Sequence, residues 1–252
     1  MIFNVGADAY DRFMGRYSGP LAPLFVELAG VTAGQRVLDV GCGPGALTAD
    51  LVRLLGAEAV WAVDPSESFV AAARQRQPAV DIRRAAAEHL PFEDGRFDAA
   101  LAQLVVHFMA DPVQGLREMG RVTRSEGCVA ACVWDHEGGQ GPLSLFWDAA
   151  SEQAGEEVGE ASLAGAREGH LAQLFDEAGL RDLEERTLTI SVKHGSFDEW
   201  WEPYTLGVGP AGAHLAGLDA VGRAELRERC CGLLPAAPFV ITARAWAVRG
   251  RV

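Results

Sequence analysis

Hydrophobic residues in the first half of the chain alternate between short β-branched runs and longer stretches with helical spacing. The run RVLDVG at 36–41 is followed at 46–55 by apolar residues every third or fourth position, the pattern of one helix face. Strands that alternate with helices in this way form a parallel sheet, so we predict an α/β fold. The repeated alternation predicts strands at 36–41, 59–64, 81–86, 97–105 and 127–135, and helices at 46–55, 66–76 and 112–122.

The alternation breaks after Asp135, where the glycine-rich stretch HEGGQGPLS begins. Acidic, alanine-rich residues follow and favour helix. The regular pattern then resumes with a helix at 170–180 and strands at 187–194 and 239–248. The second half therefore adds strands to the same sheet, separated by helical stretches.

We expect a single domain over residues 1–252, because no linker or internal repeat divides the chain. Residues 36–135 form its predicted core. The helical stretches at 136–167 and 197–231 are expected to be insertions that cover one side of this core. The aromatic residues Trp200 and Trp201 lie in the second insertion, and because adjacent helical residues diverge, we expect at most one of them to face a pocket.

Charge and composition narrow the function. The net charge of −13 repels nucleic acid and anionic membranes, so a small molecule is the expected partner. The longest nearly apolar run, AALAQLVVHFMA, is too short to span a bilayer, and the chain does not open with a signal-peptide pattern, so we expect a cytoplasmic protein. Five cysteines without paired spacing predict neither a metal site nor a disulfide framework.

The stretch VLDVGCGPGA at 37–46 is the main functional signal. Its glycines, Gly41, Gly43 and Gly45, follow a buried strand and precede a helix, where a glycine turn lets backbone amides approach a ligand. Asp64 ends the next predicted strand, a position from which a carboxylate accepts both hydroxyls of a ribose. The pattern therefore predicts an adenosine-containing cofactor.

Two classes of cofactor fit this loop, because its letters also satisfy the dinucleotide pattern G-x-G-x-x-A. Asp39 lies inside the strand, where a buried carboxylate needs partners that the loop or a cationic ligand offers. An NAD(P)-dependent oxidoreductase is the alternative, but it has no use for the long segment before the first strand. A non-catalytic module that binds the cofactor is a further alternative.

Four motifs in order, VLDVGCGPG, VDPS at 63–66, AEHLPFEDGRFDAAL at 87–101 and VHFMADP at 106–112, carry a family resemblance. The chain resembles the class I S-adenosylmethionine-dependent methyltransferases, particularly the group that includes ubiquinone and menaquinone biosynthesis enzymes. The resemblance implies a Rossmann-like, seven-stranded, mostly parallel sheet with one antiparallel strand near its end. It also implies helices on both faces, a cover of helical insertions, and an N-terminal segment at 1–35 that folds over the cofactor.

The resemblance also implies a set of cofactor-binding residues for S-adenosylmethionine and its product S-adenosylhomocysteine. Many relatives carry an aspartate at the position of Ala86, so one expected adenine contact is missing here. The implied contacts are Asp39, Gly41, Gly43 and Gly45 at the methionine end, Asp64 at the ribose, Pro65, Ser66, Ala87 and Glu88 at the adenine edge, Gln103 at the sulfonium, and Tyr10 and Arg16 over the methionine carboxylate.

Methyl transfer from a sulfonium is an in-line displacement, so alignment and exclusion of water supply much of the acceleration. A base helps where the acceptor is a hydroxyl, and His107 and His136 follow the fourth and fifth predicted strands. His107 is the leading candidate because it lies inside a matching motif. The chain lacks the N/D-P-P-Y stretch of enzymes that methylate nucleic-acid bases, so we expect a small-molecule acceptor; no sequence feature defines the oligomeric state.

Overall fold

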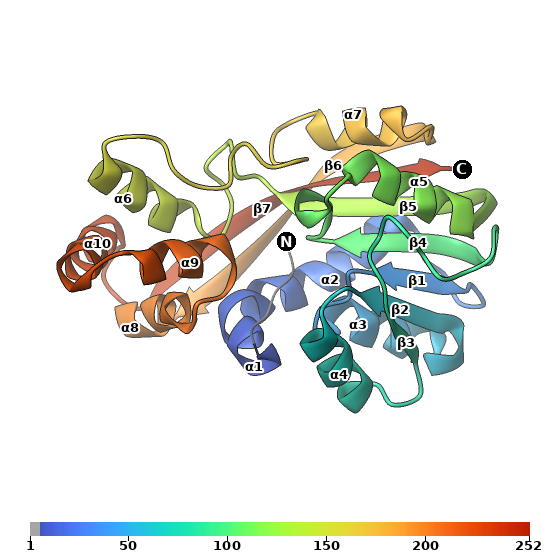
Figure 1. Ribbon diagram of the computed structural model, residues 1–252, viewed down its shortest axis with the longest axis horizontal. Helices are drawn as coiled ribbons and strands as arrows, with labels where there is room; N and C mark the ends of the chain where they lie inside the picture. Colours follow the sequence, from blue (N-terminus) through green and yellow to red (C-terminus); the bar gives the residue numbers. More distant parts are fainter. Residues whose placement is uncertain (1–5) are drawn as a thin grey trace.

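The computed structural model describes residues 6–252 and contains one seven-stranded sheet with the order β3-β2-β1-β4-β5-β7-β6 (Figure 1). All neighbouring strands are parallel except β7, which runs antiparallel to both β5 and β6. The predicted α/β fold with one antiparallel strand near the sheet's end is confirmed. The strands are β1 (Val37–Val40), β2 (Val60–Asp64), β3 (Asp81–Arg84), β4 (Phe97–Gln103), β5 (Thr123–Trp134), β6 (Arg181–His194) and β7 (Phe239–Arg251).

Helices cover both faces of the sheet, as expected, because successive strand residues point to opposite sides. Val37 and Leu101 belong to one buried cluster, whereas their neighbours Leu38 and Ala100 belong to the other. The first cluster is closed by α2 (Arg16–Ala29), α3 (Ala46–Leu55) and α4 (Glu67–Arg76), and the second by α5 (Pro112–Val122) and α7 (His170–Glu177).

Strand β6 begins at Arg181, well before the predicted start at residue 187. Its first half is mostly exposed and charged, so the sequence shows no alternation of apolar residues there. Pairing with β7 holds this half of the strand in the sheet: Glu184 lies opposite Arg249 and accepts from its guanidinium Nε at 2.7 Å. The extension therefore depends on a partner strand that a local reading of the sequence does not include.

The two insertions lie together beyond the ends of β6 and β7, where Figure 1 groups their helices apart from those that flank the sheet. The first contains one helix, α6 (Ser144–Ala154), and the rest of 136–167 is turn, bend and loop. The second contains α8 (Phe197–Trp201), α9 (Gly209–Gly217) and α10 (Ala220–Leu233). Trp200 and Trp201 are both buried, and Tyr204 stacks on Phe146 of α6 with ring centroids 4.6 Å apart. These aromatic side chains form the small core of the cover.

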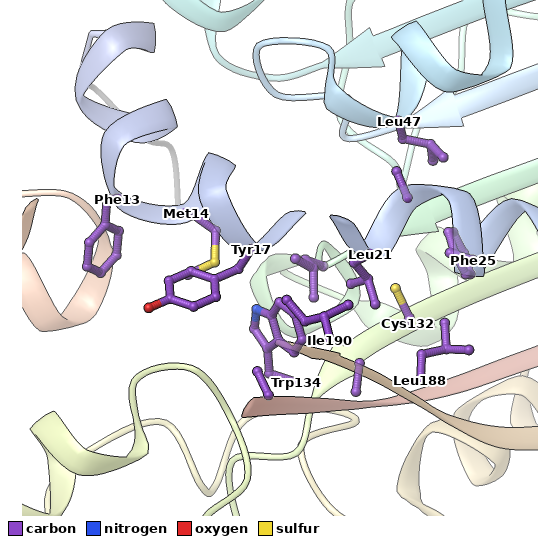
Figure 2. Close-up of a cluster of buried hydrophobic side chains, with 14 of the residues drawn as sticks. Phe13, Met14, Tyr17, Leu21, Phe25, Leu47, Cys132, Trp134, Leu188 and Ile190 are labelled. Carbon is purple, nitrogen blue, oxygen red and sulfur yellow. The ribbon is translucent and has the colours of Figure 1, made fainter. Parts of the chain in front are cut away.

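The N-terminal segment, residues 6–29, packs between the sheet and this cover. It comprises α1 (Ala7–Tyr10), a π-helical stretch and α2, and Figure 2 shows Tyr17 and Leu21 facing Trp134 of β5. Residues 1–5 of the segment predicted at 1–35 lie outside the described residues. Among residues 6–252, no helix has the length and apolar character needed to cross a bilayer.

His194 at the end of β6 anchors this segment. It accepts from Arg16 Nη1 at its Nδ1 atom, 3.0 Å away, because a guanidinium has only donors. The imidazole proton is therefore on Nε2, which lies 3.2 Å from the Tyr17 hydroxyl. Burial, with the nearby Arg16 charge, lowers the pKa of His194 to about 4, so the anchoring ring is neutral at physiological pH.

The turn from β1 to α3 requires glycine at position 41 because of its backbone conformation and its packing against Val105. Gly41 has a φ of 72°, and a Cβ atom there would lie 2.5 Å from a methyl carbon of Val105. Gly43 has a φ of 53°, but a Cβ atom there would meet nothing closer than the Tyr10 ring at 4.0 Å. The two glycines therefore differ in packing although both adopt left-handed backbone.

Gly41→Ala should lower the free energy of unfolding by about 3 kcal/mol or more, since it adds a steric clash to backbone strain. Gly43→Ala is the matched control and should lose only about 1–2 kcal/mol, from strain alone. Urea unfolding measures both, and adding Val105→Ala to Gly41→Ala should recover part of the loss. Equal losses for the two glycines would contradict this account.

Candidate functional site

The carboxyl ends of β1, β2 and β4 open onto a cavity that we call the cofactor cavity. Parallel α/β sheets bind ligands at this edge. The adjoining smaller opening, lined by Asp39, Ser18 and Gln103, extends it beneath the N-terminal segment. The predicted cofactor residues that line the cofactor cavity are Tyr10, Gly41, Gly43, Asp64, Pro65, Ser66, Ala87, Glu88 and Gln103.

Asp64 is held in place by the backbone around it. Its Oδ2 atom accepts from the Gly43 amide at 2.9 Å and its Oδ1 atom from the Ser66 amide at 2.8 Å. Burial raises its pKa, while these two amides lower it and favour the ionised form. Each oxygen retains a lone pair, so the carboxylate can still accept the two hydroxyls of a ribose.

Asp39 is buried at the end of β1, with 1% of its surface exposed. Thr48, in the first turns of α3, donates its hydroxyl to Oδ2 at 2.6 Å. Burial raises the pKa of Asp39 to about 7, with the Asp64 charge adding to the rise and the Thr48 hydrogen bond opposing it. A cationic ligand group in the adjoining opening would stabilise the ionised carboxylate, as the ammonium of an amino acid does.

Two further buried polar atoms border the same opening. Gln103 donates Nε2 to the carbonyl oxygen of Ser18 at 3.0 Å. Its Oε1 atom and the Ser18 hydroxyl are buried without a hydrogen-bond partner among residues 6–252. Buried polar groups are normally paired, so a ligand with both donors and acceptors fits here. Together, Asp39, Ser18 and Gln103 offer mainly hydrogen-bond acceptors and one hydroxyl, which matches the amino-acid end of an adenosyl amino acid.

The glycine loop serves the ligand differently from the sequence prediction. Its amides are directed at β2 rather than at a ligand: those of Gly41 and Cys42 donate to the Val63 carbonyl oxygen at 2.8 and 2.9 Å. The Gly43 amide is bonded to Asp64. The glycines therefore contribute space, since the missing side chain of Gly43 leaves the cavity wall open towards Tyr10.

Two predicted residues, Arg16 and Gly45, lie away from the cofactor cavity, and Glu88, which lines it, also has a structural contact. Arg16 lines neither the cofactor cavity nor its extension; it donates to His194 and to the Glu199 carbonyl oxygen and so fixes the N-terminal segment. Gly45 precedes α3 and faces Ala73 instead of the cavity. Glu88 accepts from the Ala110 amide at 2.7 Å and thereby holds the opposite cavity wall.

A second cavity, which we call the acceptor cavity, adjoins the first and shares Tyr10, Leu104 and Phe108 with it. It lies between the N-terminal segment, the ends of β4 and β5, and the cover. His107 and His136 both line it, with ring centroids 6.0 Å apart. Burial holds the pKa of His107 well below its usual value and lowers that of His136 to about 4, so both rings are neutral at pH 7.

Sequence reasoning missed Thr48, Ser18 and Glu160. Thr48 carried a usable signal, because a polar residue on the buried stripe of a helix next to a buried aspartate needs a partner. Ser18 and Glu160 carried no such signal. The place of Ser18 depends on how α2 crosses the sheet, and that of Glu160 on how a loop of the insertion folds back to the acceptor cavity.

Residues 38–131 match a family model described as a methyltransferase domain. A malonyl-[acyl-carrier protein] O-methyltransferase of Pseudescherichia vulneris is 36% identical over 128 residues, which cover 51% of this chain and 50% of that protein. A ubiquinone/menaquinone biosynthesis C-methyltransferase of Nitrosospira multiformis is 31% identical over 137 residues, with 51% and 56% covered. The chain thus spans about half the length of these curated relatives.

A solved structure supports the same fold over the whole chain. The phosphoethanolamine N-methyltransferase 2 of Haemonchus contortus, in complex with phosphomonomethylethanolamine and S-adenosylhomocysteine, matches with a TM-score of 0.60 at 17% identity. The match covers 97% of this chain and 56% of that one. This structural match supports the fold, while the family match and the curated relatives confirm the resemblance to S-adenosylmethionine-dependent methyltransferases that the sequence motifs carry.

Asp39→Asn should stabilise the ligand-free protein at pH 8 and weaken binding of S-adenosylhomocysteine. An ionised Asp39 destabilises the fold above its raised pKa of about 7, and this penalty fades as the pH falls from 7 towards the unfolded value near 4. The stabilisation should reach about 2–4 kcal/mol at pH 8 and shrink at pH 5. Thermal unfolding at the two pH values measures it.

The binding half of this prediction has an internal control, 5′-methylthioadenosine, which lacks the amino-acid end of the cofactor. Asp39→Asn should weaken S-adenosylhomocysteine about tenfold or more and leave the shorter ligand unchanged. A similar loss for both ligands would show that Asp39 shapes the whole cavity rather than contacting one end.

Proposed function

We propose that this protein, whose residues 38–131 match the methyltransferase domain, transfers a methyl group from S-adenosylmethionine to a small-molecule acceptor. The observation that carries the proposal is the pairing of two buried carboxylates, Asp39 and Asp64, at the ends of adjacent strands around one cavity. Asp39 faces a region suited to an ammonium, and Asp64 is positioned for a ribose. An adenosyl amino acid carries both groups, with the ammonium at its amino-acid end and the ribose between that end and the adenine.

When bound, S-adenosylmethionine supplies an electrophilic methyl group on a sulfonium. The chain's own residues orient it: Asp64 holds the ribose, Asp39 with Ser18 and Gln103 holds the amino-acid end, and Pro65, Ser66 and Ala87 border the adenine. Because α1 and α2 cover this region, the N-terminal segment excludes water from the bound cofactor. The methyl group is transferred where the two cavities adjoin.

The acceptor cavity holds the acceptor in this proposal, and the insertions at 136–167 and 197–231 form its cover. His107 is the proposed base for an acceptor that must lose a proton, since its neutral ring has a nitrogen able to accept it. The bound cofactor would supply the methyl group, and His107 would accept the proton that a hydroxylated acceptor loses. No residue here need form a covalent bond.

An NAD(P)-dependent oxidoreductase is not favoured, because the family match and the curated relatives named above are methyltransferases. A non-catalytic cofactor-binding module would require no second cavity. The acceptor cavity lies against the cofactor cavity, with Leu104 and Phe108 on both linings, which favours catalysis.

Calorimetric titration tests the cofactor. S-adenosylmethionine and S-adenosylhomocysteine should bind with micromolar dissociation constants and NADH should not bind. Asp64→Ala should weaken both adenosyl ligands, and equally 5′-methylthioadenosine, about tenfold or more, because all three carry the ribose. An unchanged dissociation constant in the variant would exclude the ribose assignment, and tight NADH binding would exclude the cofactor.

His107→Gln tests the base, with His136→Gln as the matched control on the same cavity. Release of S-adenosylhomocysteine during a screen of hydroxylated acceptors should fall about a hundredfold for the first variant, with cofactor affinity unchanged. Since the pKa of His107 lies well below 6.5, wild-type turnover should persist as the pH falls from 8 to 6. Full turnover in His107→Gln would assign the ring a structural role.

A further inference from the structure

The body of the acceptor cavity is apolar. Phe13 and Met14 line it from the N-terminal segment, Leu143 lines it near the start of α6, and Val208 lines it just before α9. All four side chains are at least nine-tenths buried. A ligand held here therefore gains affinity by burying a hydrocarbon or ring surface of its own.

Three side chains on the same walls carry a buried polar atom that has no partner within the described part of the chain. The Nδ1 atom of His107, the Nε2 atom of His136 and the indole Nε1 atom of Trp134 are buried without a hydrogen-bond partner among residues 6–252. The indole nitrogen can only donate, whereas a neutral imidazole nitrogen donates or accepts according to its tautomer. Three orphan atoms around one cavity indicate a ligand group that both donates and accepts.

Charge on the walls restricts that group further. No arginine or lysine of the described residues lines the acceptor cavity, and both histidines are neutral. Its acidic residue, Glu160, is 5% exposed and accepts from the Trp147 indole at 3.0 Å. An anionic ligand would therefore lack a counter-charge and lie near a carboxyl group, which disfavours carboxylates and phosphates.

A cationic ligand is disfavoured for a different reason. An ammonium has only donors, so it would leave the Trp134 indole N–H without an acceptor. A hydroxyl group donates to one imidazole and accepts from the indole or from the second imidazole. It satisfies the orphan atoms without burying a net charge.

We propose that the acceptor cavity binds the methyl acceptor through a hydroxyl group, and that the acceptor is an uncharged molecule with an apolar body. This inference rests on the proposed function and adds the substrate class to it. His136 and Trp134 position the hydroxyl, and the apolar walls from the N-terminal segment and the cover hold the body. The Glu160 carboxyl group on the lining disfavours anions.

Three probes that share one ring and differ in charge test this: phenol, benzoate and benzylammonium. Their dissociation constants are measured by NMR titration, with and without saturating S-adenosylhomocysteine, while the side-chain ¹⁵N resonances of the histidines are followed. Phenol should bind at least about fivefold more tightly than either charged probe and shift the His107 and His136 resonances.

Val208→Phe, which fills the cavity, should weaken phenol about fivefold or more, and Leu143→Phe serves as the second variant if the first does not fold. Val221→Phe is the control, because Val221 is 65% exposed on α10. Equal or tighter binding of a charged probe, no binding of phenol, or phenol binding that both cavity variants leave unchanged would overturn the inference. Failure of S-adenosylhomocysteine to bind would instead overturn the proposed function, while the probe ranking without it still decides the inference.

Discussion

Attachment of the glycine loop to the end of β2 is the constraint on which the site depends. Three consecutive amides, those of Gly41, Cys42 and Gly43, donate to the Val63 carbonyl oxygen and the Asp64 carboxylate. These bonds fix Asp64 relative to β1, whose Asp39 lines the adjoining opening. Because every loop donor in this run is used within the protein, ligand recognition falls to carboxylates and to the space the glycines leave.

The two cavities differ in electrostatic character, and burial is the common cause. It raises the pKa of Asp39 to about 7 and lowers that of His136 to about 4. On the cofactor side the result is carboxylates that a cationic ligand can stabilise in their charged form. On the acceptor side it is neutral imidazoles in apolar surroundings. The cationic cofactor and the uncharged acceptor that we propose would therefore have complementary environments on either side of one shared wall.

The sequence predicted the parts of this protein that depend on local pattern. Hydrophobic alternation located the strands of the core, and the motifs placed Asp64, Pro65 and Ser66 on one cavity. It failed where a residue's neighbours come from distant segments. Arg16 was expected at the methionine carboxylate, but a buried histidine far along the chain binds its guanidinium instead. Glu160 was missed because nothing local distinguishes it from the exposed acids around it.

The N-terminal segment links the two halves of the proposed mechanism. Tyr10 borders the cofactor cavity, its extension and the acceptor cavity, while Phe13 and Met14 border only the acceptor side. Its anchor is His194, on a strand that also leads into the cover through α8. One segment therefore borders both the cofactor cavity and the acceptor cavity. In the proposed mechanism, this one segment shields the sulfonium from water on the cofactor side and on the acceptor side.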